Sequence, residues 1–294
     1  MKISGFSFAK NIGKLYYPLA ESIQSILPVC DEFVIAVGKG DSDDVTRKIV
    51  EGIADPKIKI IDTDWNAPQY QKGLILSEQT NVALDACSGD WCFYVQADEV
   101  VHEKYLQIVH DRCTQLLNNN NVEGLLFKYK HFWGDYDHFH ISHAWYPNEI
   151  RIVKNRRSIQ SWGDAQSFRK NGEKVKVAKV NAEIYHYGWV RPPELMQTKK
   201  RSFLHYWGEN DFSTVTHFDY GSLEKVPRFT ETHPAVMNDW IAKMNWKDQL
   251  QYTGKSSVVS KHERFKYRLL TFLEQKVLGG KQIGGFKNYI LLDK

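Results

Sequence analysis

The stretch Asp90-Trp-Cys-Phe-Tyr-Val-Gln-Ala-Asp-Glu-Val-Val101 joins a short apolar run, Trp91 to Val95, to two acidic residues, Asp98 and Glu99. An apolar run of this length, preceded by Ser88-Gly89 and followed by acids, is typical of a strand buried on both faces of a sheet. In open α/β sheets, ligands bind at the carboxyl ends of such strands. The stretch therefore predicts a ligand site beside Asp98 and Glu99.

The two acidic residues allow two interpretations. Adjacent carboxylates at a strand end can hold a hard divalent cation, usually Mg²⁺ or Mn²⁺ beside a phosphate. Alternatively, Asp98 and Glu99 only cap a helix that begins near Glu103, because acidic residues are common where helices start. These residues alone leave both interpretations open.

Length and composition indicate a soluble globular chain. Its 294 residues suffice for one large domain, or for one domain with an extension, and 42% are hydrophobic and 25% charged. The net charge of +4 does not argue for a nucleic-acid partner. The four cysteines have no metal-type spacing, so we expect reduced thiols. No signal-peptide core and no run near ~20 apolar residues is present, so we expect a cytoplasmic protein.

The first hundred residues alternate between apolar runs and amphipathic segments. Strands are predicted at 2–8, 33–37, 57–61 and 91–95, with helices at 15–27, 45–53 and 77–87 between them. This alternation predicts a parallel sheet with right-handed crossovers. Three strand–helix units would place three loops on one edge of the sheet, beside Asp98. That edge would form a crevice of mononucleotide size.

The rest of the chain is less regular. A helix is predicted from 103 to 116, strands at 123–130, 149–154 and 174–180, and a functional loop or hairpin at 131–146. The loop carries His138, His140 and His143, but no further ligand pair completes a zinc site, so an acceptor-side role is the better interpretation. From about 192 the chain becomes helical and basic, which predicts a first domain at 1–190 and a C-terminal extension at 191–294.

Between Lys255 and Lys287, eight Lys and Arg face two Glu, a local net charge of +6. A helix in this range would carry on one face the apolar residues Phe265, Leu269, Leu270, Leu273 and Val277. It could lie on an anionic membrane surface as a peripheral contact. We expect the commoner arrangement, in which the apolar face packs on the protein and the lysines stay solvated.

Four segments match family motifs in order. Ile3 to Asn11 is similar to an opening strand with an "AKNE" turn, and Asp31 to Thr46 to "DEIVVVDSGSTDDT". Gly73 to Glu99 is similar to "G…QRN.AL..A.GDW…DADE", which is the most specific match because several spacings agree, and Arg151 to Lys154 to "RLFR". Over about residues 2–190 the chain thus resembles the family 2 glycosyltransferases, and within them the bacterial enzymes of lipopolysaccharide core and other surface glycans.

The resemblance implies an α/β protein with a GT-A fold, a Rossmann-like and mostly parallel sheet with helices on both faces, followed here by the helical extension. It implies an inverting glycosyltransferase that moves a sugar from a nucleotide-diphosphate donor to a glycan or lipid-linked acceptor. A divalent metal, Mn²⁺ or Mg²⁺, would stabilise the negative charge that develops on the departing nucleotide. Three positions depart from the family pattern: Gln96 replaces the first Asp of the DXD-like motif, Gly38 stands where an Asp is frequent, and Thr80 replaces an Arg.

Candidate site residues follow from the resemblance. Asp98 would be the main metal ligand and His186 the second, although a core histidine bonded to backbone is the alternative for His186. The residues expected around the nucleotide sugar are Ala9, Lys10, Asn11, Gly38, Asp41, Asp43, Gln79, Gln96, Ala97 and Asp98.

Inversion needs a carboxylate that takes the proton of the acceptor hydroxyl. Asp164 is the first candidate for this base, Glu149 the second, and Glu99 would assist the metal or contact the acceptor. The alternative for Asp164 is an ordinary Gly-Asp turn. The candidates for acceptor binding are Trp162, Trp133 and Trp189.

Two other functions remain open. A sugar nucleotidyltransferase also pairs a βα sheet with Mg²⁺, but Ala9 to Gly13 lacks its Gly-rich, Arg-containing phosphate loop. A non-catalytic carbohydrate-binding relative is the other alternative, and Gln96 and Gly38 are the residues that favour it.

Overall fold

Four parallel strands form one end of the central sheet. They are β1 (Ile3–Ala9), β2 (Glu32–Gly38), β3 (Ile58–Thr63) and β4 (Trp91–Tyr94), in the spatial order β3-β2-β1-β4. Every residue of β2 and β4 is buried, as their continuous apolar runs predict. This computed structural model describes residues 1–65, 72–207, 214–256, 262, 264–280, 282–285 and 287–292.

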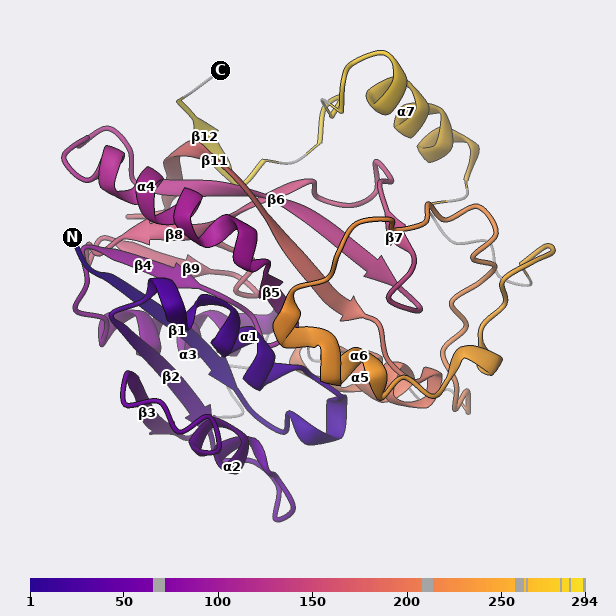
Figure 1. Cartoon of the computed structure of the whole chain (residues 1–294), viewed down its shortest axis with the longest axis horizontal. Coiled ribbons are helices and arrows are strands. Elements are labelled where there is room, and N and C mark those ends of the chain that lie inside the picture. Colours follow the sequence, from indigo (N-terminus) through magenta and orange to yellow (C-terminus); the bar gives the residue numbers. More distant parts are fainter. Residues whose placement is uncertain are drawn as a thin grey trace.

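Helices cover both faces of this parallel part (Figure 1). On one face, α1 (Leu19–Ile26), α2 (Thr46–Glu51) and α4 (Leu106–Leu116) share a buried cluster with Phe33 and Ile35. On the other, α3 (Leu74–Asp85) packs on Val34 and Ala36. The α/β class and the two covered faces are therefore confirmed, with α3 beginning three residues earlier than predicted.

Beyond β4 the sheet becomes mixed. The order continues through β8 (Asn148–Lys154), β6 (Gly124–Trp133), β11 (Glu173–Trp189), β10 (Ser167–Lys170) and β9 (Ile159–Trp162). The 17-residue β11 is much longer than the strand predicted at 174–180. Its register against β6 shifts between Lys179 and Glu183, which breaks the simple alternation of side chains.

The far end of β11 returns to the edge where β4 ends. There it pairs with a short strand, β5 (Glu99–Val101), in antiparallel register, with His186 opposite Glu99. The predicted loop at 131–146 contains a hairpin strand, β7 (Phe139–His140), paired with β6. The chain of β11 thus carries residues 183–189 beside the acidic tip of β4.

The chain after 190 contains α5 (Pro193–Tyr206), α6 (Asn238–Ala242), α7 (Phe265–Lys276) and short 3-10 turns, as predicted for a helical extension. It ends in β12 (Tyr289–Leu291), which adds to β11 in parallel. A domain boundary at 190 stays a prediction. Across the ranges given above, no helix is long and apolar enough to cross a bilayer.

A buried ion pair joins β5 to the antiparallel part of the sheet. Arg151 donates from Nε and Nη2 to the two carboxylate oxygens of Glu99, each at 2.7 Å, and both side chains have no exposed surface. The Tyr129 hydroxyl and the Gln96 backbone N–H also donate to Glu99, at 2.7 and 3.1 Å. Because every partner is present, the desolvation of two charges is compensated here.

We expect Arg151→Met to lower the free energy of unfolding by about 3–5 kcal/mol, because it leaves the Glu99 carboxylate buried and unpaired. Urea denaturation followed by circular dichroism measures this loss. Arg157→Met, at an exposed position between β8 and β9, is the control, and its free energy of unfolding should stay within about 0.5 kcal/mol of the parent. Equal midpoints for the two variants would contradict a structural role of the pair.

Candidate functional site

The loops after β1 and β2 bind each other at the predicted edge. The Asn11 side-chain carbonyl accepts from the Asp41 backbone N–H at 3.0 Å, and the Asn11 N–H donates to Asp44 at 3.1 Å. Asn11 has a left-handed φ of 54°, a conformation that asparagine tolerates better than most residues. Ala9, which ends β1, is buried beneath this turn. The structure thus brings these predicted nucleotide-site segments together.

Trp65 lies against Gly38, where β2 ends. A Cβ atom on Gly38 would stand 2.2 Å from the indole Nε1, so only glycine allows this approach. The Lys10 ammonium lies 5.0 Å from the centroid of the same ring. The sequence analysis did not identify Trp65 as a site residue. An aromatic face with a cation at the end of β1 and β2 suits a planar base.

The other predicted nucleotide residues differ in exposure. Asp41 and Asp43 are exposed and both pair with the Lys14 ammonium, at 2.7 and 2.6 Å, which lowers the pKa of each carboxylate. Gln79 is buried on α3 and accepts from the Thr63 hydroxyl at 2.5 Å. Gln79 therefore supports the end of β3 from below.

Asp98 is a buried, ionised carboxylate at the tip of β4. Its Oδ2 accepts from the Lys199 ammonium at 3.0 Å, and its backbone carbonyl accepts from the Tyr187 N–H at 2.8 Å. Burial alone would raise the pKa of Asp98, but the nearby charges of Lys199 and Arg191 outweigh burial and lower it. The helix-cap alternative for Asp98 and Glu99 is wrong, because the side chain of His102 caps the turn that begins at Glu103.

His186 faces Asp98 through an unprotonated nitrogen. His131 Nε2 lies 2.8 Å from the Tyr146 carbonyl oxygen, which can only accept, so Nε2 carries the proton. Burial lowers the pKa of His131 well below its usual value, so this neutral ring accepts at Nδ1 from His186 Nδ1, 2.9 Å away. Burial also lowers the pKa of His186, against the charge of Asp98. The neutral His186 ring therefore has a bare Nε2, 3.8 Å from Asp98 Oδ1.

Asp98 and His186 fit the two-ligand part of a divalent-cation site. A carboxylate oxygen is a suitable ligand for Mn²⁺ or Mg²⁺, and an unprotonated imidazole nitrogen can join it on Mn²⁺. Gly188 lies directly beside these two groups, and a Cβ atom there would stand 2.4 Å from His186 Nε2 and 2.8 Å from Asp98 Oδ2. Any larger residue would therefore crowd the two ligand atoms. No group of three or more His, Cys, Asp or Glu in the described parts of the chain forms a metal cluster.

Sequence reasoning missed two cations beside Asp98. Lys199, on α5, donates to Asp98 and to the Gly188 carbonyl oxygen, the latter at 2.8 Å. Arg191 is fully buried over the ring of Tyr17, 4.6 Å from its centroid, and donates from Nη1 to the Leu15 carbonyl. Burial lowers the pKa of Lys199 to about 8. Both lie in a part of the chain that has no period or motif to mark them.

Asp164 lies in a strained turn that contacts the same edge. Its neighbours Gly163 and Ala165 have φ values of 64° and 63°, and the Ala165 carbonyl accepts from the Gln96 side chain at 3.3 Å. Asp164 is half-buried and packs against Gly73, at the start of α3. The turn thus holds a partly accessible carboxylate next to the residues that precede Asp98.

The other two candidate acids are enclosed. Glu99 has no exposed surface, and all its partners are protein groups, so in this conformation it cannot contact an acceptor. Glu149 is 3% exposed and accepts from Gln166 at 2.8 Å. Burial raises the pKa of Glu149 to about 7, against the charge of Arg151.

The three predicted acceptor tryptophans have different surroundings. Trp133 and Trp189 stack with ring centroids 5.0 Å apart, and Trp133 is 6% exposed. Trp162 is 56% exposed, with the Arg169 guanidinium 5.8 Å from its ring centroid. Of the three, Trp162 therefore has the most surface available for a ligand.

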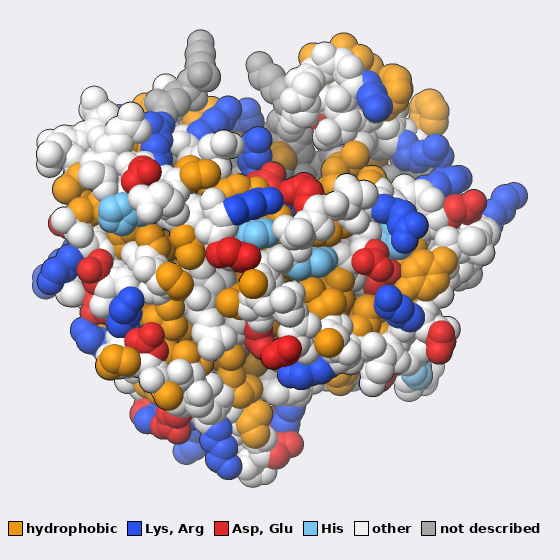
Figure 2. Space-filling model, in the orientation of Figure 1, with side chains coloured by type: hydrophobic (Ala, Val, Ile, Leu, Met, Phe, Trp, Pro, Cys, Tyr) orange, Lys and Arg blue, Asp and Glu red, His pale blue; other side chains and the backbone are white. Residues whose placement is uncertain are grey.

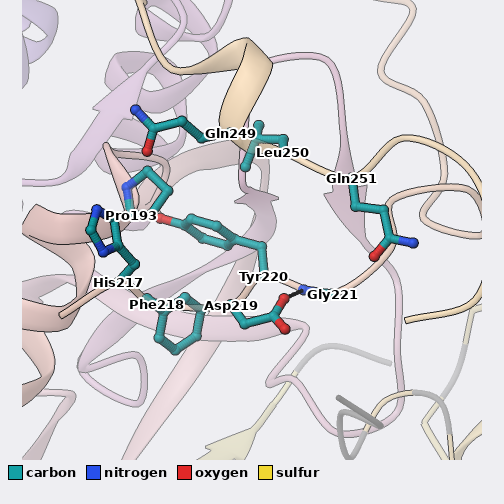
Figure 3. A pocket seen from close by; sticks show the side chains of 9 residues that line it. All are labelled: Pro193, His217, Phe218, Asp219, Tyr220, Gly221, Gln249, Leu250 and Gln251. Atoms are coloured by element: carbon teal, nitrogen blue, oxygen red, sulfur yellow. Dashed lines mark hydrogen bonds between the residues drawn. The ribbon is translucent and has the colours of Figure 1, made fainter. Parts of the chain in front are cut away.

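A separate hollow of about 520 Å³ opens beside the start of α5. Tyr220 reaches across it toward Pro193, with Phe218 and Gln249 on either side (Figure 3). The Tyr220 hydroxyl donates to the Arg191 carbonyl at 2.9 Å. None of the predicted site residues lines this hollow.

The histidines of the predicted loop do not gather. His138 pairs with Asp135 at 2.8 Å, while His143 pairs with Glu274 of α7 at 2.6 Å. Each histidine thus connects its own part of the loop to a different neighbour.

Comparisons with known proteins show remote similarity. Neither a protein-family model nor a curated protein sequence matches the chain. Among solved structures, S. aureus TarS is 16% identical, with a TM-score of 0.40, over 72% of this chain and 41% of that one. TarS 1–349 in complex with UDP-GlcNAc is 16% identical, with a TM-score of 0.40, over 72% of this chain and 68% of that one. Glucosyl-3-phosphoglycerate synthase from Mycobacterium tuberculosis, in complex with phosphoglyceric acid, is 14% identical, with a TM-score of 0.38, over 72% of this chain and 81% of that one. The chain thus spans less than half of the longer TarS structure.

We expect Glu149 to make stability fall as pH rises. A carboxyl whose pKa is raised from 4.5 to about 7 by folding contributes fully below pH 4.5, and this contribution is lost by about pH 7. The loss is about 3 kcal/mol. Urea denaturation between pH 4 and 8 should show this decline in the parent relative to Glu149→Gln. Glu173→Gln, at an exposed position, should follow the parent, and parallel curves for the parent and Glu149→Gln would contradict the prediction.

Proposed function

We propose that this chain is an inverting glycosyltransferase that moves a sugar from a nucleotide-diphosphate donor to a glycan or lipid-linked acceptor. One observation carries the proposal: the ionised Asp98 carboxylate and the bare Nε2 of His186 face each other at the end of β4. The loops after β1 and β2 meet at the same edge. Asp98 and His186 could hold a divalent cation, and the nearby Lys199 and Arg191 could attract an anion. This combination suits a bound diphosphate and its counter-ion.

The donor would lie across the ends of β1, β2 and β4. Its base would stack on Trp65 beside Gly38, and Lys10 and Asn11 would line the base pocket through backbone groups, next to Ala9. Its diphosphate would reach Ala97 and Asp98. Gln96 bonds to the turn that carries Asp164, which would bring the sugar between the diphosphate and that turn.

A divalent cation, Mn²⁺ or Mg²⁺, would be held by Asp98 and His186 and would supply Lewis-acid stabilisation of the leaving diphosphate. The hydrogen bond from His186 Nδ1 to His131 keeps Nε2 available for this role. A histidine orientated through its second nitrogen is the usual arrangement of a metal ligand.

Asp164 would take the proton of the acceptor hydroxyl. The Gly163–Ala165 turn keeps its carboxylate partly accessible, whereas Glu99 and Glu149 are enclosed. Trp162, two residues earlier and exposed, offers a ring face for the acceptor sugar. General-base catalysis of this kind contributes about 10²–10⁴-fold to a rate.

A nucleotide panel tests this proposal. We expect one of UDP, GDP, CMP or dTDP to raise the melting temperature in the presence of Mn²⁺, since a ligand at 100 times its Kd stabilises the folded state by about 2.7 kcal/mol. Asp98→Asn should abolish the effect. Asp164→Asn is the matched control: it should keep the nucleotide effect but lower the turnover of the corresponding nucleotide sugar about 100-fold or more. If no nucleotide stabilises the parent, the proposal fails, and the carbohydrate-binding alternative is favoured.

We further propose that α7 places the enzyme as a peripheral protein on the inner face of the membrane. We expected the apolar face of α7 to pack on the protein, and for most of that face this prediction is wrong. Phe265 is 80% exposed, Leu269 47% and Val277 65%. The opposite side is the docked one, since Thr271 and Glu274 bond to His143. Hydrophobic and basic side chains lie together at the upper right of Figure 2, over α7. This combination suits an anionic lipid surface.

Vesicle sedimentation tests the α7 proposal. We expect binding to phosphatidylcholine vesicles that contain phosphatidylglycerol, and at least about tenfold weaker binding of Phe265→Ser, because a buried Phe contributes about 1.5–3 kcal/mol. Lys266→Glu should weaken binding in a salt-dependent way. Lys48→Glu, on the exposed side of α2, is the charge control. Binding that is equal in the parent and in Phe265→Ser would rule out α7 as the contact.

A further inference from the structure

We infer that Lys199 is a resident counter-ion of Asp98, which competes with a divalent cation for this carboxylate until a diphosphate draws the ammonium away. This inference rests on the proposed function and names how its site is regulated. The starting observation is that Lys199 Nζ lies 3.0 Å from Asp98 Oδ2. A lysine therefore pairs with the carboxylate that is expected to hold the metal.

The position of Lys199 is specific. Its ammonium also donates to the Gly188 carbonyl at 2.8 Å and lies 5.0 Å from the centroid of the Tyr17 ring. Its side chain is 16% exposed and that of Asp98 is 8% exposed. A pair this enclosed is little screened by solvent, so the attraction is much stronger than that of a surface pair.

The ammonium and a metal would share one carboxylate. A divalent cation held by Asp98 and His186 would be close to the Lys199 ammonium, because that ammonium is already 3.0 Å from Asp98 Oδ2. Two positive charges at such a separation repel each other in a poorly hydrated site. Metal binding is therefore weakened for as long as Lys199 remains on Asp98.

A diphosphate relieves this repulsion. The ammonium uses two of its three N–H groups on Asp98 and Gly188, which leaves the third for a phosphate oxygen. Arg191 adds a second buried charge nearby, and its Nε and Nη2 have no hydrogen-bond partner within the described chain. The buried Lys199 and Arg191 thus place two cations beside the single carboxylate of Asp98, an arrangement that favours an added anion.

The consequence is coupled binding. Because Lys199 moves from the carboxylate to the diphosphate, the diphosphate improves the affinity for the metal, and the metal improves the affinity for the diphosphate by the same factor. Lys199 is thus a positioning residue that weakens metal binding when no diphosphate is bound.

Direct Mn²⁺ binding to the full chain, measured by electron paramagnetic resonance of free Mn²⁺, tests this without any turnover. We expect weak binding by the parent without nucleotide, and binding tighter by about tenfold or more in Lys199→Met, which removes the competing charge. Lys200→Met, the exposed neighbour on α5, is the matched control and should bind Mn²⁺ as the parent does. Equal Mn²⁺ affinity in the parent and Lys199→Met would overturn the inference.

The second arm uses UDP, GDP and dTDP with EDTA. We expect the diphosphate that binds the parent to bind Lys199→Met about tenfold more weakly, because an ammonium contact is lost. If none binds the parent, with or without Mn²⁺, the proposed function fails, but the Mn²⁺ comparison still decides the role of Lys199. Lys199→Gln replaces Lys199→Met if the latter does not fold. An unchanged Mn²⁺ affinity in a folded Lys199→Gln would overturn the inference equally.

Discussion

The ion pair between Glu99 and Arg151 is the constraint on which the site depends. It takes two charges fully out of water, so it stabilises the fold only where Tyr129 and the Gln96 backbone complete its hydrogen bonds. Gln96 follows β4, Tyr129 lies in β6 and Arg151 lies in β8. A shift of any of these elements would leave a charge unpaired, and the turn that presents Asp98 is therefore held in one position.

The charge one residue earlier in the chain, on Asp98, is compensated less completely. Glu99 has every partner within the protein, whereas Asp98 has Lys199 on one oxygen and, among the described residues, the bare Nε2 of His186 near the other. Arg191 adds a second buried charge, and its Nε and Nη2 have no hydrogen-bond partner among the described residues. A complete set of partners characterises structural charges, and an incomplete set characterises charges that await a ligand. Adjacent acidic residues thus have separate roles.

The sequence predicts the parallel part of the fold and the position of Asp98, because continuous apolar runs specify buried strands and the strand ends specify the edge. It does not predict the length of β11, since the register shift after Lys179 disrupts the alternation. Nor does it predict the contacts of Trp65 or Lys199. These depend on which segments meet in space, and a lone Trp or Lys in an aperiodic stretch has no local signal.

The chain after 190 is best understood as part of the site. The Tyr220 hydroxyl bonds to the Arg191 carbonyl just before α5 begins, and α5 then carries Lys199 to Asp98. The aromatic residues that pack around Tyr220 therefore help to determine where the Lys199 ammonium lies relative to Asp98. A loosening of that packing would move Lys199 without altering β4 or β11. In this arrangement, the extension can change the charge beside Asp98 and His186, the proposed metal ligands, without a change in the sheet, which is what the proposed counter-ion role of Lys199 requires.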